Sequence, residues 1–242
     1  MKKISSIFLL FLLLVLPIHV KANTYYITGT DLSISIDNSS WHVFTRDNIY
    51  QNSELTALEL TYEYMNEYMK NNQVYLDAAE FVNDDDDENL EFFISIFTLE
   101  EKVGNLHTYS SKEINGLGKE LINSGKFNTS SFEIYGNEYK YIELEYRDMG
   151  YNFYQFYTVI NGRGYNFIAQ KTNPITYEDK NEIKRIIDTI NFNIDEDYEK
   201  SISSSSSNLT LNNAILGAIK GAIIAGGSVI IVKIINKKKR HQ

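Results

Sequence analysis

The stretch 151–171 reads YNFYQFYTVINGRGYNFIAQK, with two runs rich in aromatic and β-branched residues on either side of Asn161-Gly162. Aromatic and β-branched residues favour extended strands. Asparagine and glycine tolerate the positive φ angles that a two-residue type I′ turn requires. The stretch therefore predicts an antiparallel β-hairpin within an antiparallel central sheet.

More strand-like segments precede this hairpin. In DLSISI (31–36) and in WHVFT (41–45), apolar residues alternate with polar ones on either side of the turn-like DNSS, which predicts a hairpin of two half-buried strands. The remaining candidates follow in chain order: VYLDAAEF (74–81), LEFFISIF (90–97), SFEIYGN (131–137) and YKYIELEYR (139–147). The domain is therefore expected to be built around a sheet of several strands.

Three segments repeat apolar residues every three or four positions, which is the period of a helix with one buried face. The second and third begin with the capping boxes Ser110…Glu113 and Thr176…Asp179. The stripes are Leu55, Leu58, Tyr62, Met65 and Met69; Ile114, Leu117 and Leu121, in a segment that Gly116 and Gly118 interrupt; and Ile183, Ile186, Ile187 and Ile190. Strands and helices together predict an α+β fold, with an antiparallel β-sheet sandwiched by helices.

The chain begins with a pattern typical of a secretory signal peptide. Residues 1–22 combine a cationic start, an apolar run from Ile7 to Leu16, the helix-breaking Pro17 and a small residue, Ala22. We therefore expect export and cleavage after Ala22. A retained N-terminal anchor stays open as the alternative, because Lys21 makes the cleavage site imperfect.

A second apolar segment, 213–236, is long enough for a helix to cross the hydrocarbon core of a bilayer. Lys220 and Lys233 lie toward its ends, where their ammonium groups can reach the lipid head groups. The basic tail 237–242 marks the cytoplasmic side. A helix lying flat on the membrane is the alternative, but the apolar residues surround the helix axis. We therefore predict one C-terminal transmembrane helix in the cell membrane, with the N-terminal domain outside.

Small residues recur at every fourth position of the predicted transmembrane helix, at Gly217, Gly221 and Ala225. This spacing puts them on one face, where two helices can approach closely. The pattern indicates helix packing and self-association. Glycine and alanine are also common in anchors that do not pair, so this second interpretation stays open.

Residues 23–192 form the predicted extracytoplasmic domain, and 193–212 an acidic and serine-rich flexible tether with little to bury. All 32 acidic residues but only 14 of the 23 lysines and arginines lie between the two predicted membrane segments. This acidic excess argues against nucleic acid and anionic lipid surfaces as partners. The chain has no cysteine, which excludes disulfides, thiol nucleophiles and thiolate metal sites.

Several of these segments together resemble the PsbP-like α/β/α sandwich family, over about Asp31 to Phe192. The resemblance implies a fold of this type and a binding or accessory module without its own catalytic activity. Two departures are Ser39-Ser40 where the family often has a proline before the tryptophan, and an acidic NDDDDEN insertion. The resembling stretches are DLSISIDNSSWHVFTRD (31–47), NNQVYLDAAEF (71–81), YTVINGRGYNF (157–167) and IKRIIDTINF (183–192). Because the insertion and the C-terminal anchor are not core features of the family, its partners are not transferred to this chain.

Few residues carry the pattern of an active site. His42 and His107 are not spaced as metal ligands on one helix face, and we predict no catalytic residue, cofactor or metal site. His42 is expected on a strand, facing solvent. The acidic run Asp84–Glu88 has no glycine to turn the backbone, so it does not match a calcium loop. Weak, nonspecific cation binding stays open there.

Tyrosines gather in the second half of the predicted domain. Exposed tyrosines on a sheet often form recognition surfaces, whereas strands also favour aromatic residues that pack under helices. Both interpretations stay open for Tyr135, Tyr139, Tyr141, Tyr146, Tyr151, Tyr154 and Tyr157.

Two functions follow from these patterns. The leading one is a membrane-anchored extracytoplasmic binding or accessory domain, not an enzyme, with a protein partner at the cell envelope. The alternative is a cell-envelope hydrolase that uses paired carboxylates. Such an enzyme requires two carboxylates with displaced pKa values in a concave pocket.

Overall fold

The computed structural model describes residues 22–58, 60–80, 89–99, 102–123, 129 and 131–204. The predicted signal peptide up to Lys21, the acidic run Asp84–Glu88, the transmembrane helix 213–236 and the basic tail 237–242 all lie outside the described residues. Within the described ranges, no helix is both long enough and apolar enough to span a bilayer.

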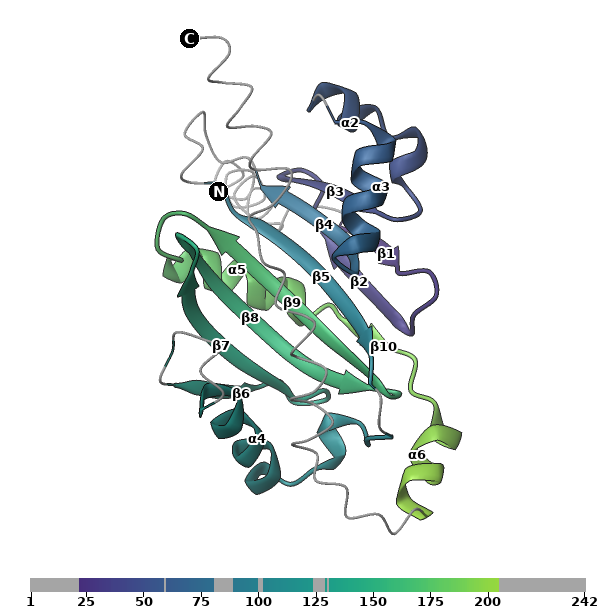
Figure 1. Cartoon of the computed structure of the whole chain (residues 1–242), viewed down its shortest axis with the longest axis vertical. Coiled ribbons are helices and arrows are strands. Elements are labelled where there is room, and N and C mark those ends of the chain that lie inside the picture. The colour runs from purple at the N-terminus through teal and green to yellow at the C-terminus, as the bar shows by residue number, and fades with distance from the viewer. Residues whose placement is uncertain are drawn as a thin grey trace, which may run out of the picture.

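A seven-stranded sheet forms the centre of the molecule (Figure 1), and each neighbouring pair of its strands is antiparallel. The order across the sheet is β3-β4-β5-β9-β8-β7-β6. The strands are β3 (Trp41–Thr45), β4 (Val74–Glu80), β5 (Glu91–Thr98), β6 (Phe132–Tyr135), β7 (Tyr141–Asp148), β8 (Tyr151–Ile160) and β9 (Arg163–Lys171). The predicted strands from residue 74 onward are therefore confirmed as members of one antiparallel sheet.

The hairpin of β8 and β9 has the turn that its sequence predicts. Ile160 pairs with Arg163, which leaves Asn161 and Gly162 as the two turn residues. Their φ angles are 48° and 71°. Both angles lie in the left-handed region, as a type I′ turn requires.

A second, three-stranded sheet has the order β1-β2-β10 and consists of β1 (Asn23–Tyr26), β2 (Leu32–Ile36) and β10 (Asn191–Phe192). The predicted hairpin between 31–36 and 41–45 is therefore wrong, because β2 and β3 belong to different sheets. Alternate residues of β2 are buried, so this strand can cover the core from outside. Four of the five residues of β3 are buried, which suits a strand with packing on both faces.

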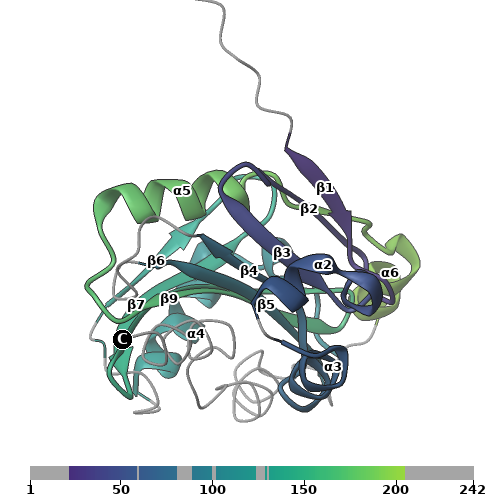
Figure 2. The ribbon, with the colours of Figure 1, turned by 90° about the horizontal axis from the view of Figure 1, so that it is seen from above.

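The molecule is layered around the seven-stranded sheet (Figure 2). Helix α5 (Tyr177–Ile187) and the three-stranded sheet lie on one side of it, and α3 (Tyr62–Asn71) and α4 (Ser111–Asn123) on the other. The largest hydrophobic cluster, which includes Trp41, Phe156 and Phe167, fills the space under α5 and the small sheet. Smaller clusters lie under α4 and under α3. The expected sandwich is confirmed, with a small sheet sharing one outer layer with a helix.

The first predicted helix is two helices in the structure, α2 (Ser53–Ala57) and α3. The gap between the two helices ends at Thr61. The Thr61 side chain accepts a hydrogen bond from the Tyr64 N–H and thereby caps the start of α3. Leu55, Met65 and Met69 still share one buried cluster. The apolar residues of the predicted stripe are thus buried together, although the helix breaks between α2 and α3. The spacing of these residues does not predict that break.

Part of the predicted tether has regular structure. Glu196–Ser204 form the helix α6, so a flexible spacer starting at residue 193 is wrong for these residues. Asp195 precedes the helix, and its Oδ1 accepts hydrogen bonds from the N–H groups of Asp197 and Tyr198, both at 3.0 Å. This cap satisfies two donors at the start of the helix. Residues 205–212 of the predicted tether lie outside the described residues.

Two glycines of α4 allow a matched prediction about stability. A Cβ on Gly118 would lie 2.3 Å from the Phe132 ring, whereas one on Gly116 would meet nothing within 4 Å. We expect Gly116→Ala to raise the free energy of unfolding by about 0.5–1 kcal/mol, because alanine loses less backbone entropy in a helix. Gly118→Ala should lower it by about 1–2 kcal/mol through overpacking. Urea denaturation checks both, and equal effects of the two variants would contradict the close approach of α4 to β6.

Candidate binding site

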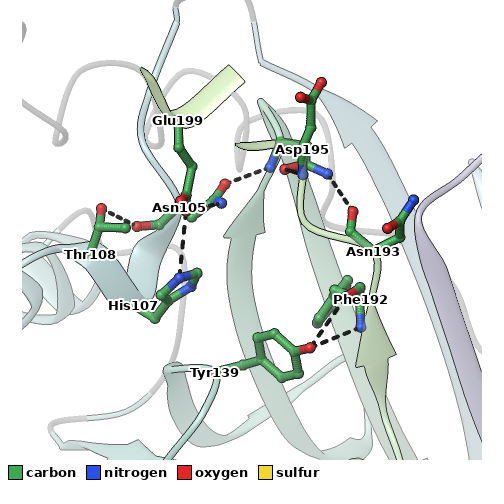
Figure 3. Close-up of polar contacts among 9 residues, drawn as sticks. Asn105, His107, Thr108, Tyr139, Phe192, Asn193, Asp195 and Glu199 are labelled. Carbon is green, nitrogen blue, oxygen red and sulfur yellow. Dashed lines mark hydrogen bonds and ion pairs between the residues drawn. The ribbon is translucent and has the colours of Figure 1, made fainter. Parts of the chain in front are cut away.

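The turn between β8 and β9 is the centre of a polar network that joins four segments of the chain. Figure 3 shows the part of this network around Asn105, Asn193 and Asp195. The backbone N–H of Asn161 donates to Asn105 Oδ1 at 2.6 Å. Its side-chain Nδ2 lies 3.1 Å from Asp31 Oδ2 and 2.9 Å from the Asn193 carbonyl. Its Oδ1 accepts from the Asp195 N–H at 3.1 Å. Asn161 therefore fixes the 27–31 loop, the exit from β10 and the start of α6 relative to the seven-stranded sheet.

Helix α6 contacts the segment before α4 through two consecutive side chains. The Tyr198 hydroxyl donates to the Val103 carbonyl at 2.8 Å. Glu199 Oε1 accepts from Asn105 Nδ2 at 2.6 Å and lies 3.5 Å from His107 Nε2. Asn105 is fully buried, so its side chain makes its hydrogen bonds with Asn161 and Glu199 in the protein interior. These contacts dock α6 on the rest of the domain.

Tyr139 holds the short strand β10 from the inside. Its hydroxyl accepts from the Phe192 N–H at 3.2 Å. The same hydroxyl lies within donating distance of Asn191 Oδ1, at 3.2 Å, and of the Phe192 carbonyl, at 3.3 Å. The Tyr139 and Phe192 rings meet edge to face, with their centroids 4.9 Å apart. The two-residue strand β10 is thus held by the Tyr139 side chain as well as by its pairing with β2.

An open groove of about 400 Å³ lies next to this network, at the end of the three-stranded sheet. Its size falls within the usual range for small-molecule sites. Among the described residues that line it, Asp31 is the single charged side chain, and buried Ile27, Leu32 and Phe192 form its apolar base. The lining residues are Tyr26, Ile27, Thr28, Thr30, Asp31, Leu32, Ser33, Asn191, Phe192 and Asn193. The groove therefore offers hydroxyls, amides, one carboxylate and one exposed aromatic ring.

A pair of carboxyl groups lies elsewhere, on the face of the seven-stranded sheet that α3 covers. Asp77 on β4 and Glu91 on β5 are both fully buried. Asp77 pairs with Phe93, so Glu91 is its diagonal neighbour on the same face. Burial, the charge of Glu91 and a hydrogen bond shared with Glu91 raise the pKa of Asp77 well above its usual value. Gln170 Nε2 donates to Glu91 Oε2 at 2.6 Å. The pair is part of the protein interior and not of the groove.

The predicted site residues have different outcomes. Gly217, Gly221 and Ala225 lie outside the described residues, so helix packing through them stays a prediction. His42 lies on β3 as expected, half-exposed, with its Nδ1 2.8 Å from Glu54 Oε2. In the described part of the chain, no group of three or more histidine and acidic residues could hold a metal ion.

The gathered tyrosines pack into the interior and do not form an exposed face. Tyr139, Tyr141, Tyr154 and Tyr157 are buried, Tyr135 and Tyr146 pack against the hydrophobic clusters, and Tyr151 is partly buried. Burial raises the pKa of Tyr157 well above its ordinary value. The recognition-surface interpretation of this cluster is therefore wrong, because the strands that carry it lie under α4 and α5.

The groove and the network behind it were missed at the level of sequence. Asn161 was predicted only as a turn residue, and its four contacts come from segments up to 130 residues away. The signal that was present is the density of asparagine at the turn, in β10 and just after β10, at Asn161, Asn191 and Asn193. Asparagine amides both donate and accept hydrogen bonds, so such a density is typical of a side-chain network.

No protein-family model and no curated protein matches the chain. Among solved structures, the chain is similar to the solution structure of cyanobacterial PsbP (CyanoP) from Synechocystis sp. PCC 6803. The two share 12% sequence identity, the match covers 72% of this chain and 94% of that chain, and the TM-score is 0.41.

Proposed function

We propose that the protein is a membrane-anchored extracytoplasmic binding or accessory domain, and that the groove beside Asp31 is its binding site. The observation that carries this proposal is the groove itself, an open recess of about 400 Å³ lined mostly by uncharged polar side chains. The location outside the cell membrane is supported by the predicted signal peptide 1–22, the predicted transmembrane helix 213–236 and the basic tail 237–242. Its partner is then a component of the cell envelope.

Two polar groups of the groove are held in position from behind, which favours binding. Asp31 Oδ2 is fixed by Asn161, and Asn191 Oδ1 is fixed by the Tyr139 hydroxyl. A site whose side chains are already ordered loses less conformational entropy when a ligand binds. The groove is thus preorganised by contacts that do not use its open side.

The hydrolase alternative receives less support. Acid and base catalysis of that kind requires two carboxylates that a substrate can reach. Among the described residues that line the groove, Asp31 is the one carboxylate. Asp77 and Glu91 form a pair with a displaced pKa, but both are fully buried. We therefore propose binding without catalysis.

Site-specific photo-crosslinking in the native cells tests the binding site. A photoreactive phenylalanine derivative replaces Tyr26 in the groove or, as a control, Tyr50 on the 3-10 helix Ile49–Gln51. The two tyrosines are similarly exposed, at 77% and 69%. We expect a covalent adduct from position 26 and none from position 50. Adducts from neither position, or equal adducts from both, would reject the groove as the binding site.

The membrane orientation is tested separately, with an epitope tag at the C-terminus of the full chain. We expect the protein to stay in the membrane pellet after alkaline carbonate washing, with the tag protected from protease added outside the cell. A variant that ends at Asn212 should be released. Extraction of the full chain by carbonate, or loss of the tag to the external protease, would contradict the anchor or its orientation.

A further inference from the structure

We propose that the groove binds a neutral, polyhydroxylated ligand, that is, a segment of an uncharged glycan. This inference rests on the proposed function, because it assigns a chemical class to the ligand of the same groove. It is carried by three features of the groove: a row of side chains across the small sheet, a set of oriented donors and acceptors, and the absence of a cation among its described lining residues.

The row consists of Tyr26, Ser33 and Asn191 on three adjacent strands. Ser33 pairs with Tyr26 on one side and with Asn191 on the other, so the three side chains share the outer face of the sheet. Two strand spacings make the row about 10 Å long. The Tyr26 side chain is 77% exposed. An open aromatic ring can cover the apolar C–H face of a sugar ring while its own hydroxyl stays in water.

Hydrogen-bonding groups surround this row. Because the Tyr139 hydroxyl is 3.2 Å from Asn191 Oδ1, the Nδ2 group of Asn191 is the one that remains to donate to a ligand. Asp31 keeps one carboxylate oxygen beyond the one that accepts from Asn161, and it can accept from two ligand hydroxyls. Thr28 and Ser33 add hydroxyls that both donate and accept. A ligand with several hydroxyl groups matches donors and acceptors that alternate over this short distance.

The charge around the groove favours a neutral ligand. No lysine, arginine or histidine is found among the described residues that line it, so no described side chain in the wall of the groove can form an ion pair with an anionic ligand. A cationic ligand is disfavoured for a different reason. Arg163 Nη1 donates to the Gly29 carbonyl at 2.6 Å, on the loop that leads to Asp31. Arg163 and Asp31 act on the pKa of Tyr165 in opposite directions, so the positive charge of this guanidinium offsets part of the negative charge that a cationic ligand would meet.

Isothermal titration calorimetry of the full-length protein tests this class. The protein is kept in a detergent without a sugar head group, because an alkyl glycoside would itself compete for the groove. The probes are cellotriose, maltotriose and triacetylchitotriose as neutral trisaccharides, trigalacturonic acid as the anionic one and the glucosamine trimer as the cationic one. We expect at least one neutral probe to bind saturably, and the two charged probes to bind at least tenfold more weakly.

Two variants in the groove and one control outside it test whether the trisaccharide binds in the groove. Tyr26→Ala and Asn191→Ala should each lower the affinity for the neutral trisaccharide that binds by at least tenfold, while Tyr50→Ala should leave this affinity unchanged. Binding of none of the neutral probes, stronger binding of a charged probe, or indifference to both groove variants would overturn the proposed ligand class. The photo-crosslinking outcome is independent of these titrations. An adduct at position 26 without neutral trisaccharide binding would retain the proposed function and reject only the glycan.

Discussion

Asn161→Ala should lower the free energy of unfolding by about 2–4 kcal/mol and release α6 from the domain. The variant removes the amide that contacts Asp31, the Asn193 carbonyl and the Asp195 N–H. Each such hydrogen bond contributes about 0.5–1.5 kcal/mol. Alanine also tolerates the observed φ of 48° poorly. Urea denaturation measures the stability, and hydrogen exchange of the amides of Glu196–Ser204 measures the docking of α6.

Asn161→Gly is the matched control for this prediction. Glycine accepts the positive φ without strain but provides none of the three side-chain hydrogen bonds. We expect it to undock α6 as alanine does, while costing about 1 kcal/mol less in stability. If hydrogen exchange in α6 were unchanged in both variants, the contacts of Tyr198 and Glu199 would be sufficient to dock this helix without Asn161. If the two variants were equally stable, the strain at residue 161 would be negligible.

Asp77→Asn should raise the free energy of unfolding by about 2–3 kcal/mol at pH 8, the range expected when a buried, poorly paired charge is relieved. Two carboxylates cannot donate to each other when both are ionised, so Asp77 and Glu91 share a hydrogen bond only when one of them is protonated. In the described part of the chain, no group other than the Glu91 carboxyl is placed to donate to the Asp77 oxygens. An asparagine amide can donate to Glu91 at any pH.

The raised pKa of Asp77 sets the direction of the pH dependence. Below the pKa of aspartate in the unfolded chain, about 3.9, the carboxyl is protonated in both states and its contribution to stability is fully present. As the pH rises through the higher pKa of the folded protein, that contribution is lost. The variant should therefore resemble the wild type at acidic pH and exceed it at neutral and alkaline pH.

Thermal or urea denaturation between pH 5 and pH 9 measures this difference. Asp47→Asn is the control, because Asp47 is exposed and its replacement should leave the pH profile unchanged. A wild-type protein that gains stability as the pH rises over this range, or an Asp77→Asn variant less stable than wild type at pH 8, would show that the pair is ionised and otherwise compensated.

Local signals in the sequence were sufficient for most elements of the fold. The Asn161-Gly162 turn and the two capping boxes depend on contacts between neighbours along the chain, and their geometry is set by backbone sterics and by side chains three or four residues apart. The strands from Val74 onward were recognised from the local density of aromatic and β-branched residues, which favour extended backbone. These predictions were confirmed because no distant contact competes with the local preference.

Predictions that depended on the partner of a segment were less successful. The residues Leu32–Ile36 have the pattern of a half-buried strand, but the pattern is the same whether that strand pairs with β3 or lies in a separate sheet. Residues 196–204 have few apolar side chains and were predicted to be flexible. They form α6, which docks through Tyr198 and Glu199 onto Val103 and Asn105, about 95 residues earlier in the chain.

By itself, the sequence determined the α+β class, the antiparallel hairpin, the helices α4 and α5 and the acidic, cysteine-free character of the chain, because periodicity and composition act over short distances. The tertiary structure alone decided which strands share a sheet, which tyrosines are buried, and how Asp31, Asn161 and Asn191 come together around one groove. Those choices depend on contacts between residues far apart in sequence, and a pattern of neighbouring residues contains no information about such pairs.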